Sequence, residues 1–232
     1  MSTDHSSRIH LRPASRSLGL LGLASIATIL VGALVTALPY SGYLAEKYSP
    51  LNHFISELGE VPTSRLAFVF NTGLLVGAIG LGFFLVILAG RVDGVFRPAL
   101  MVAGLVSGAA GALLGVFPMN DHALHRPLSF AFFLTAWLVA AIFSAWLLRP
   151  RAGFSRALVM PGAIAVVTSI VFIFVYTSQY HPKDPSAPIL GRSPVWAPAW
   201  LEWASLLTLF GWFACVSIAL LRQPDSTEKA DA

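Results

Sequence analysis

Six long apolar runs, separated by polar connections, dominate the pattern of hydrophobic and polar positions along the chain. They cover residues 18–38, 66–89, 99–117, 128–148, 157–177 and 200–221. A helix needs roughly 20 apolar residues to cross about 30 Å of hydrocarbon. Strands of a membrane barrel would be about ten residues long and would alternate in polarity. The pattern therefore predicts an all-α integral membrane bundle of six transmembrane helices.

The composition agrees with this architecture, since 56% of the residues are hydrophobic and only 11% are charged. The first run follows three arginines, but it exceeds the roughly 7 to 15 apolar residues of a signal-peptide core. We interpret it as an uncleaved first helix, with cleavage as the alternative. Residues 1–16 and 223–232 are polar, and we expect two disordered cytoplasmic tails around a membrane domain of residues 17–222.

The basic residues predict the orientation. Ten lysines and arginines lie in the two tails and the connections at residues 90–97 and 149–156, against five in the three longer connections. The positive-inside rule then places both termini in the cytoplasm of a cell-membrane protein. The basic residues are dispersed along helix ends rather than gathered in one patch, which argues against nucleic acid as a partner.

Glycines recur four residues apart in the second and third runs. Gly73 with Gly77, Gly104 with Gly108, and Gly111 with Gly115 each share a helix face. Small residues at this spacing let helix backbones approach closely in a membrane. Together with the short connection at residues 90–97, they predict a close hairpin of the second and third helices.

The first external loop carries the strongest local pattern. Ser49 precedes Pro50, and Gly59 follows nine residues after the proline, which are typical start and stop signals of a helix. They predict a short helix of about two turns over residues 50–58. Its apolar face would hold Leu51, Phe54, Ile55 and Leu58, and its polar face Asn52, His53, Ser56, Glu57 and Glu60. We expect this helix to lie along the membrane interface.

Residues 48–59, Tyr-Ser-Pro-Leu-Asn-His-Phe-Ile-Ser-Glu-Leu-Gly, resemble the signature of a bacterial membrane family called domain of unknown function 998. Phe117 and Pro118, followed by Asp121 and His125, are similar to the second motif of that family, with Asn120 where an acid would also fit. The Ile-Ser-Glu-Leu-Gly turn is similar, more loosely, to the eukaryotic six-span Frag1/DRAM/Sfk1 membrane proteins. The resemblance implies an architecture and a site region, and it implies no particular activity.

Every histidine outside the N-terminal tail falls on the predicted external side: His53, His122, His125 and His181. Ionisable groups near a membrane are costly and tend to mark functional sites. His53 and Glu57 are four residues apart and would be neighbours on one helix face, as would Asp121 and His125 if the fourth helix begins early. The candidate outer-face polar site therefore comprises His53, Ser56, Glu57, Asp121 and His125.

Four interpretations of this site remain open. It is a structural polar network, a pocket for a lipid headgroup or small amphiphile, a metal-dependent hydrolase acting at the outer leaflet, or part of a small-solute transporter. Zinc would need about three such ligands, with His122, His181 and Glu202 as further candidates, but no HExxH motif supports a metal assignment. The spans are almost free of charge, with Asn71 as the main polar interruption, which disfavours a transport site at the midplane. We expect membrane lipid as the partner and leave the cofactor, the substrate and any enzymatic activity open.

Overall fold

The computed structural model describes residues 15–61, 63–150, 153–180 and 189–223. Six α-helices follow one another: α1 (Ser15–Ala37), α2 (Ala67–Ala89), α3 (Phe96–Val116), α4 (His122–Leu147), α5 (Val159–Gln179) and α6 (Ala197–Leu221). Two short 3-10 helices, η1 (Ile55–Gly59) and η2 (Arg156–Leu158), precede α2 and α5. Six helices of the described chain are long and apolar enough to cross a membrane, and no strand occurs in it, which confirms the predicted all-α, six-span architecture.

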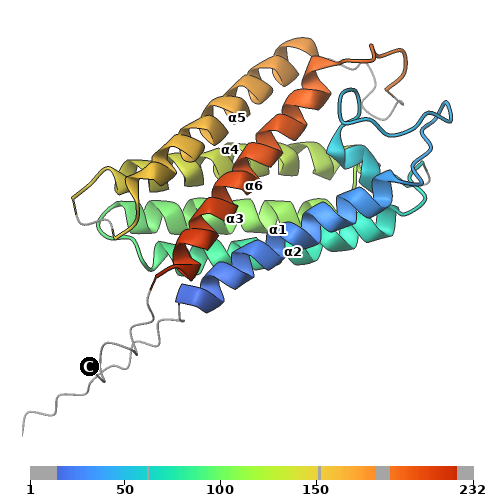
Figure 1. The fold of residues 1–232 in the computed structure, drawn as a ribbon. Helices are drawn as coiled ribbons and strands as arrows, with labels where there is room; N and C mark the ends of the chain where they lie inside the picture. Colours follow the sequence, from blue (N-terminus) through green and yellow to red (C-terminus); the bar gives the residue numbers. More distant parts are fainter. Residues whose placement is uncertain (1–14, 62, 151–152, 181–188, 224–232) are drawn as a thin grey trace, which may run out of the picture.

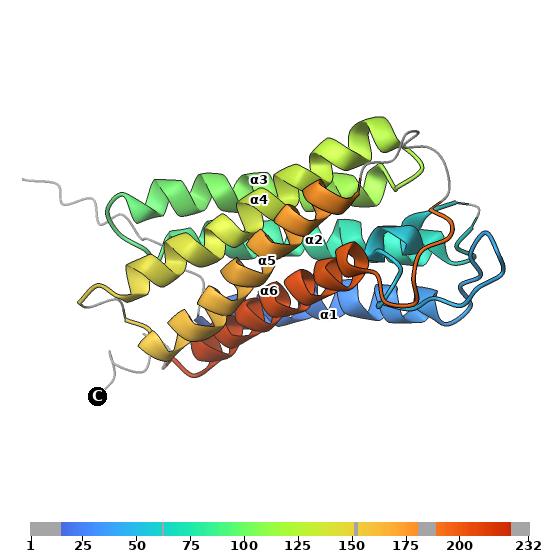
Figure 2. The same ribbon diagram turned by 90° about the horizontal axis from the view of Figure 1, so that it is seen from above.

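The six helices form a closed ring. Each one packs against its neighbours in the sequence, and α6 returns to pack against α1. Figures 1 and 2 show the arrangement, with α5 and α6 running obliquely to α3 and α4. A ring of this kind places the inner faces of the helices around a common centre, where a cavity can form.

The two ends of the described chain lie side by side at one end of the ring. The Ser15 hydroxyl donates a hydrogen bond to Gln223 Oε1 over 3.2 Å. Helix α1 begins two residues inside the predicted N-terminal tail, and the rest of that tail lies outside the described residues, as do residues 224–232. The opposite end of the ring carries η1, and we call it the η1 end (Figure 1). Which end faces the cytoplasm stays a prediction.

Close backbone contacts hold α2 against both of its neighbours. A Cβ atom added at Gly108 of α3 would lie 2.6 Å from the Gly82 Cα of α2, so the predicted hairpin of the second and third helices is observed. Gly73 and Gly77, however, face α1 rather than α3, and a Cβ at Gly77 would lie 2.7 Å from the Ser25 carbonyl oxygen. Gly73 and Gly77 lie on the face of α2 that meets α1, and Gly82 lies on the face that meets α3. Helix α2 is therefore fixed from two sides.

We predict that Gly108→Ala lowers the free energy of unfolding by about 1–3 kcal/mol, because the new methyl group meets backbone atoms that cannot move aside. Gly211→Ala is the matched control, since nothing lies within 4 Å of a Cβ atom there. Thermal unfolding in detergent, followed by tryptophan fluorescence, measures both variants. An unfolding midpoint that stays at the wild-type value in Gly108→Ala would show that the contact is dispensable.

Candidate functional site

The segment between α1 and α2 folds into the η1 end as a turn followed by a 3-10 helix. The Ser49 carbonyl accepts a hydrogen bond from the His53 N–H at 2.8 Å. At Phe54 the backbone becomes extended, with φ −63° and ψ 150°, before η1 begins. The prediction of one two-turn helix over residues 50–58 is therefore wrong. The Glu57 carboxylate accepts the Phe54 N–H at 2.7 Å, which satisfies a donor that a continuous helix would bond to its own backbone.

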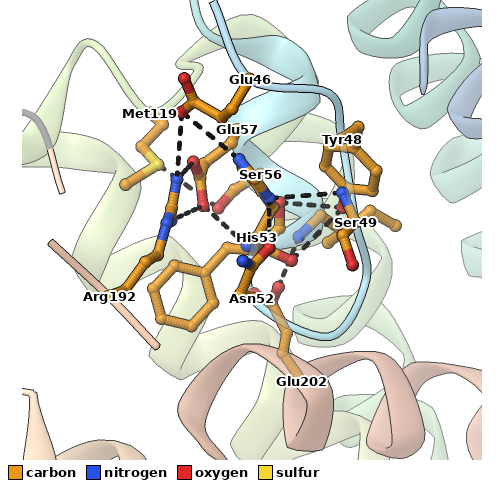
Figure 3. A network of polar contacts seen from close by, with 12 residues as sticks. Glu46, Tyr48, Ser49, Asn52, His53, Ser56, Glu57, Met119, Arg192 and Glu202 are labelled. Atoms are coloured by element: carbon orange, nitrogen blue, oxygen red, sulfur yellow. Dashed lines mark hydrogen bonds and ion pairs between the residues drawn. The ribbon is translucent and has the colours of Figure 1, made fainter. Parts of the chain in front are cut away.

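The burial of this segment departs from the amphipathic pattern on its polar face. His53 and Glu57 are only 2% and 4% exposed, whereas Leu51 of the predicted apolar face is 50% exposed. Figure 3 shows both polar side chains directed into a network of contacts between segments that are distant in sequence. The segment therefore turns its charged groups into the protein, where other parts of the chain supply their partners.

Glu57 forms a buried ion pair with Arg192 from the connection between α5 and α6. Arg192 Nη1 lies 2.7 Å from Glu57 Oε1, and Nη2 lies 2.8 Å from Oε2, which is the bidentate geometry of a strong pair. Burial opposes the charge of Arg192, but the hydrogen bonds and charge of Glu57 outweigh it and raise the pKa of the guanidinium. The pair joins the first connection of the chain to the last one.

His53 lies next to this pair and reaches a second carboxylate. Its Nδ1 atom is 2.7 Å from Asn52 Oδ1 and 3.3 Å from the Ser49 backbone nitrogen. Its Nε2 atom lies 3.6 Å from Glu46 Oε1. Burial lowers the pKa of His53, against the opposing effect of the Glu57 charge. The imidazole is therefore held in its neutral form near neutral pH and fixes the turn that precedes η1.

A central cavity lies beneath η1 and is lined by every α-helix except α5. Its polar lining is concentrated near the η1 end, where Ser56, Asn71, His125, Ser129 and Glu202 contribute to the wall. Apart from Ser107, the remainder of the lining consists of apolar side chains and Gly108, Gly111 and Pro118. On α6 the wall extends from Glu202 to Phe213, which is about 16 Å along the helix axis. The cavity thus has one polar end and a long apolar interior.

The polar groups at this end have defined partners. His125 Nδ1 lies 2.9 Å from the Phe117 carbonyl oxygen. Because a carbonyl oxygen only accepts, Nδ1 carries the hydrogen, and Nε2 of the neutral ring is an acceptor. The Ser56 hydroxyl donates to Met119 Sδ at 3.6 Å, and Glu202 Oε2 accepts the Ile55 N–H at 2.7 Å. One carboxylate therefore holds the start of η1 and also lines the cavity.

A second cavity lies between α4 and α5 and shares a wall with the central one. The residues common to both linings are Ser56, His125, Ser129, Phe133 and Glu202. The second cavity adds aromatic rings from both helices, together with His122 and Arg126. The two cavities therefore meet at the same polar groups.

The structure divides the five predicted site residues into three groups. Ser56 and His125 line both cavities. His53 and Glu57 belong to the buried network and line neither cavity. Asp121 caps the start of α4, where its carboxylate accepts the Leu124 N–H at 3.3 Å. Helix α4 does begin early, but the side chains of Asp121 and His125 bond to different backbone groups rather than to each other.

Two residues that the sequence did not place in the site prove central to it, namely Arg192 and Ser129, and so does Glu202, which the sequence offered only as a further zinc candidate. Arg192 was recognisable as a basic residue on the side where arginine is scarce, and Glu202 as the only acid within its apolar run. Among the described residues, no three His, Cys, Asp or Glu side chains lie close enough to hold a metal ion, and His181 lies outside them. The described part of the chain therefore contains no cluster of residues that could bind zinc.

Asn71, the main polar interruption of the spans, contacts the connection that precedes its own helix. Its side-chain amide donates to the Gly59 carbonyl at 3.1 Å, so it holds the end of η1 rather than a neighbouring helix. The connection between α3 and α4 holds this region as well, because Asn120 Oδ1 accepts the Val61 N–H at 2.7 Å. Three connections of the chain thus converge on η1.

We predict that Arg192→Met destabilises the folded protein by about 3–5 kcal/mol, because it leaves the Glu57 carboxylate buried without its partner. Arg149→Met is the control, since the Arg149–Asp93 pair is 49% and 79% exposed and should cost no more than about 1 kcal/mol. Thermal unfolding in detergent measures the two. Equal losses in both variants would contradict a special role for the buried pair.

We also predict that stability falls as the pH drops below the ordinary His53 pKa of about 6.5. The folded state holds the pKa of His53 below that value, so protons bind the unfolded chain more readily and favour it at low pH. In His53→Gln the loss of stability between about pH 7.5 and 5.5 becomes shallower. The His53 ring signal, identified by its absence in that variant, gives the titration directly by NMR. Titration at or above the ordinary value would refute the prediction.

Comparison with known proteins places the chain in a family. No curated protein and no solved structure matches it. Residues 26–219, which include all of the polar groups described above, match the family described as "Protein of unknown function (DUF998)". The resemblance inferred from the first-loop motif is therefore confirmed, and the chain belongs to this family of proteins of unknown function.

Proposed function

We propose that this protein binds one amphiphilic lipid in the central cavity. The head group of the lipid contacts the polar end, at Ser56, His125 and Glu202, and its tail occupies the apolar interior. The observation that carries the proposal is the distribution of polarity along the cavity, with polar groups near η1 and hydrocarbon along about 16 Å of α6 below them. An amphiphile has a polar head group and an apolar tail, so its polarity changes along its length in the same way.

The composition of the cavity lining supports a ligand. Sites for small molecules are mostly apolar with a few polar groups, and this lining has the same composition. Protein interiors are otherwise close-packed, because an empty space deprives its lining of dispersion contacts. A lipid tail would restore those contacts for side chains such as Leu81, Phe210 and Phe213.

The contacts of the two serines favour binding over hydrolysis. A serine nucleophile needs its hydroxyl hydrogen-bonded to a base. Ser56 donates to the Met119 sulfur, and Ser129 donates to the backbone carbonyl of His125 at 2.9 Å. Both hydroxyls are thus engaged away from the imidazole. We therefore assign the site to holding an amphiphile and not to cleaving one.

We place the η1 end at the outer surface of the cell membrane, with both termini in the cytoplasm. The support is the excess of arginine and lysine in the connections at the opposite end. In this orientation the head group of the ligand lies at the level of the outer leaflet. The aromatic residues Tyr48, Tyr176, Tyr180 and Trp203 at the η1 end suit a membrane–water interface.

We predict that Leu206→Trp removes most of the lipid that co-purifies with the protein, because the larger ring fills the cavity. Leu206 lines the cavity and is 5% exposed. The adjacent Leu207 is 51% exposed on the outside of α6, so Leu207→Trp is the matched control and retains its lipid. Mass spectrometry of lipid extracted from the monodisperse fraction gives the lipid-to-protein ratio. Equal ratios in the two folded variants would overturn the proposal.

A further inference from the structure

The chemistry of the cavity lining also selects the head group. We infer that the ligand of the central cavity is an uncharged amphiphile with a hydroxyl head group, of the class of long-chain alcohols and acylglycerols. This inference rests on the proposed function and narrows it, since membranes also offer fatty acids, amines and phosphate-bearing lipids. It depends on the charges and the hydrogen-bonding groups that line the cavity.

The charge of the lining excludes an anionic head group. No lysine or arginine is among the described residues that line the central cavity, whereas Glu202 is one of them. Arg192 is paired with Glu57, and Arg126 lines only the second cavity. A phosphate or carboxylate would therefore find no lysine or arginine among the described residues of the central lining itself. Burying a charge without a partner is among the most expensive changes that a protein interior can undergo.

The hydrogen-bonding groups at the polar end are mostly acceptors. Nε2 of neutral His125 accepts, because Nδ1 donates to the Phe117 carbonyl. The hydroxyl hydrogens of Ser56 and Ser129 are already given to Met119 and to the His125 carbonyl, so their oxygens are left as acceptors. A head group that donates a hydrogen bond complements this set.

A hydroxyl meets these conditions better than an ammonium group. It donates one hydrogen bond to an acceptor such as His125 Nε2, and its oxygen accepts in turn. An ammonium group would donate as well, but it would bring a full charge into a wall that is mostly hydrocarbon. Because burying a full charge costs more than burying a hydroxyl group, the lining favours the neutral head group.

Four probes with the same saturated chain test the inference: hexadecanol, hexadecanoic acid, hexadecylamine and hexadecyl phosphate. Each is added to the purified protein after detergent exchange, and mass spectrometry counts the probe that remains after size-exclusion chromatography. We expect hexadecanol to be retained near one molecule per chain and the two acidic probes at least about tenfold less. Leu206→Trp should lose hexadecanol, and Leu207→Trp should keep it.

A substitution at the polar end tests the contact itself. His125→Phe removes the acceptor and keeps a ring, so hexadecanol should bind about tenfold more weakly, as expected for the loss of one hydrogen bond. His122→Phe is the matched control, because His122 lines only the second cavity. Unchanged affinity in a folded His125→Phe variant would overturn the assignment of the hydroxyl to this imidazole.

The outcomes separate the inference from the proposed function. If an acidic probe or hexadecylamine is retained as well as hexadecanol, and Leu206→Trp abolishes that retention, the cavity binds amphiphiles but the head-group inference is wrong. If the wild-type protein retains none of the four probes, and its co-purifying lipid is unaffected by Leu206→Trp, the proposed function itself fails.

Discussion

The η1 end of this protein depends on two buried carboxylates that accept consecutive backbone N–H groups. Glu57 accepts the N–H of Phe54, and Glu202 accepts that of Ile55, each at 2.7 Å. An irregular segment that enters a membrane bundle must have its backbone groups satisfied by protein, because hydrocarbon supplies no partner. Arg192 balances the charge of Glu57 from a third part of the chain. These contacts let η1 lie over the centre of the ring.

The same contacts couple the covering segment to the cavity. Glu202 holds the first N–H of η1 and lines both cavities, and Ser56, the next residue of η1, lines them as well. A head group that bonds to this wall therefore touches the residues that fix η1 in place. Under the proposed function, binding of the ligand and ordering of η1 would be linked, because both would depend on Glu202.

The spans were predictable because the thickness of the hydrocarbon imposes their length, and no distant contact is needed to recognise them. The conformation of residues 50–58 was not predictable, because the amphipathic pattern treats Glu57 as a solvent-facing group. Glu57 is instead paired with Arg192, which lies 135 residues away in the sequence. Ser56 and His125 could be proposed from the two motifs. Glu202 could be offered only as a further zinc candidate, since a single acid at the end of an apolar run has no spacing that relates it to the first loop.

The cavity is a consequence of how the ring is assembled, and loose packing does not account for it. Without a hydrophobic drive between helices in lipid, association depends on close backbone contact and interhelical hydrogen bonds. Helices α2 and α3 meet through Gly82 and Gly108, and α5 meets α6 through the Ser169–Ser205 hydroxyls at 2.8 Å. Both contacts are close. The chain packs tightly at these seams and leaves an apolar space between them, and this is the space that we propose an amphiphile fills.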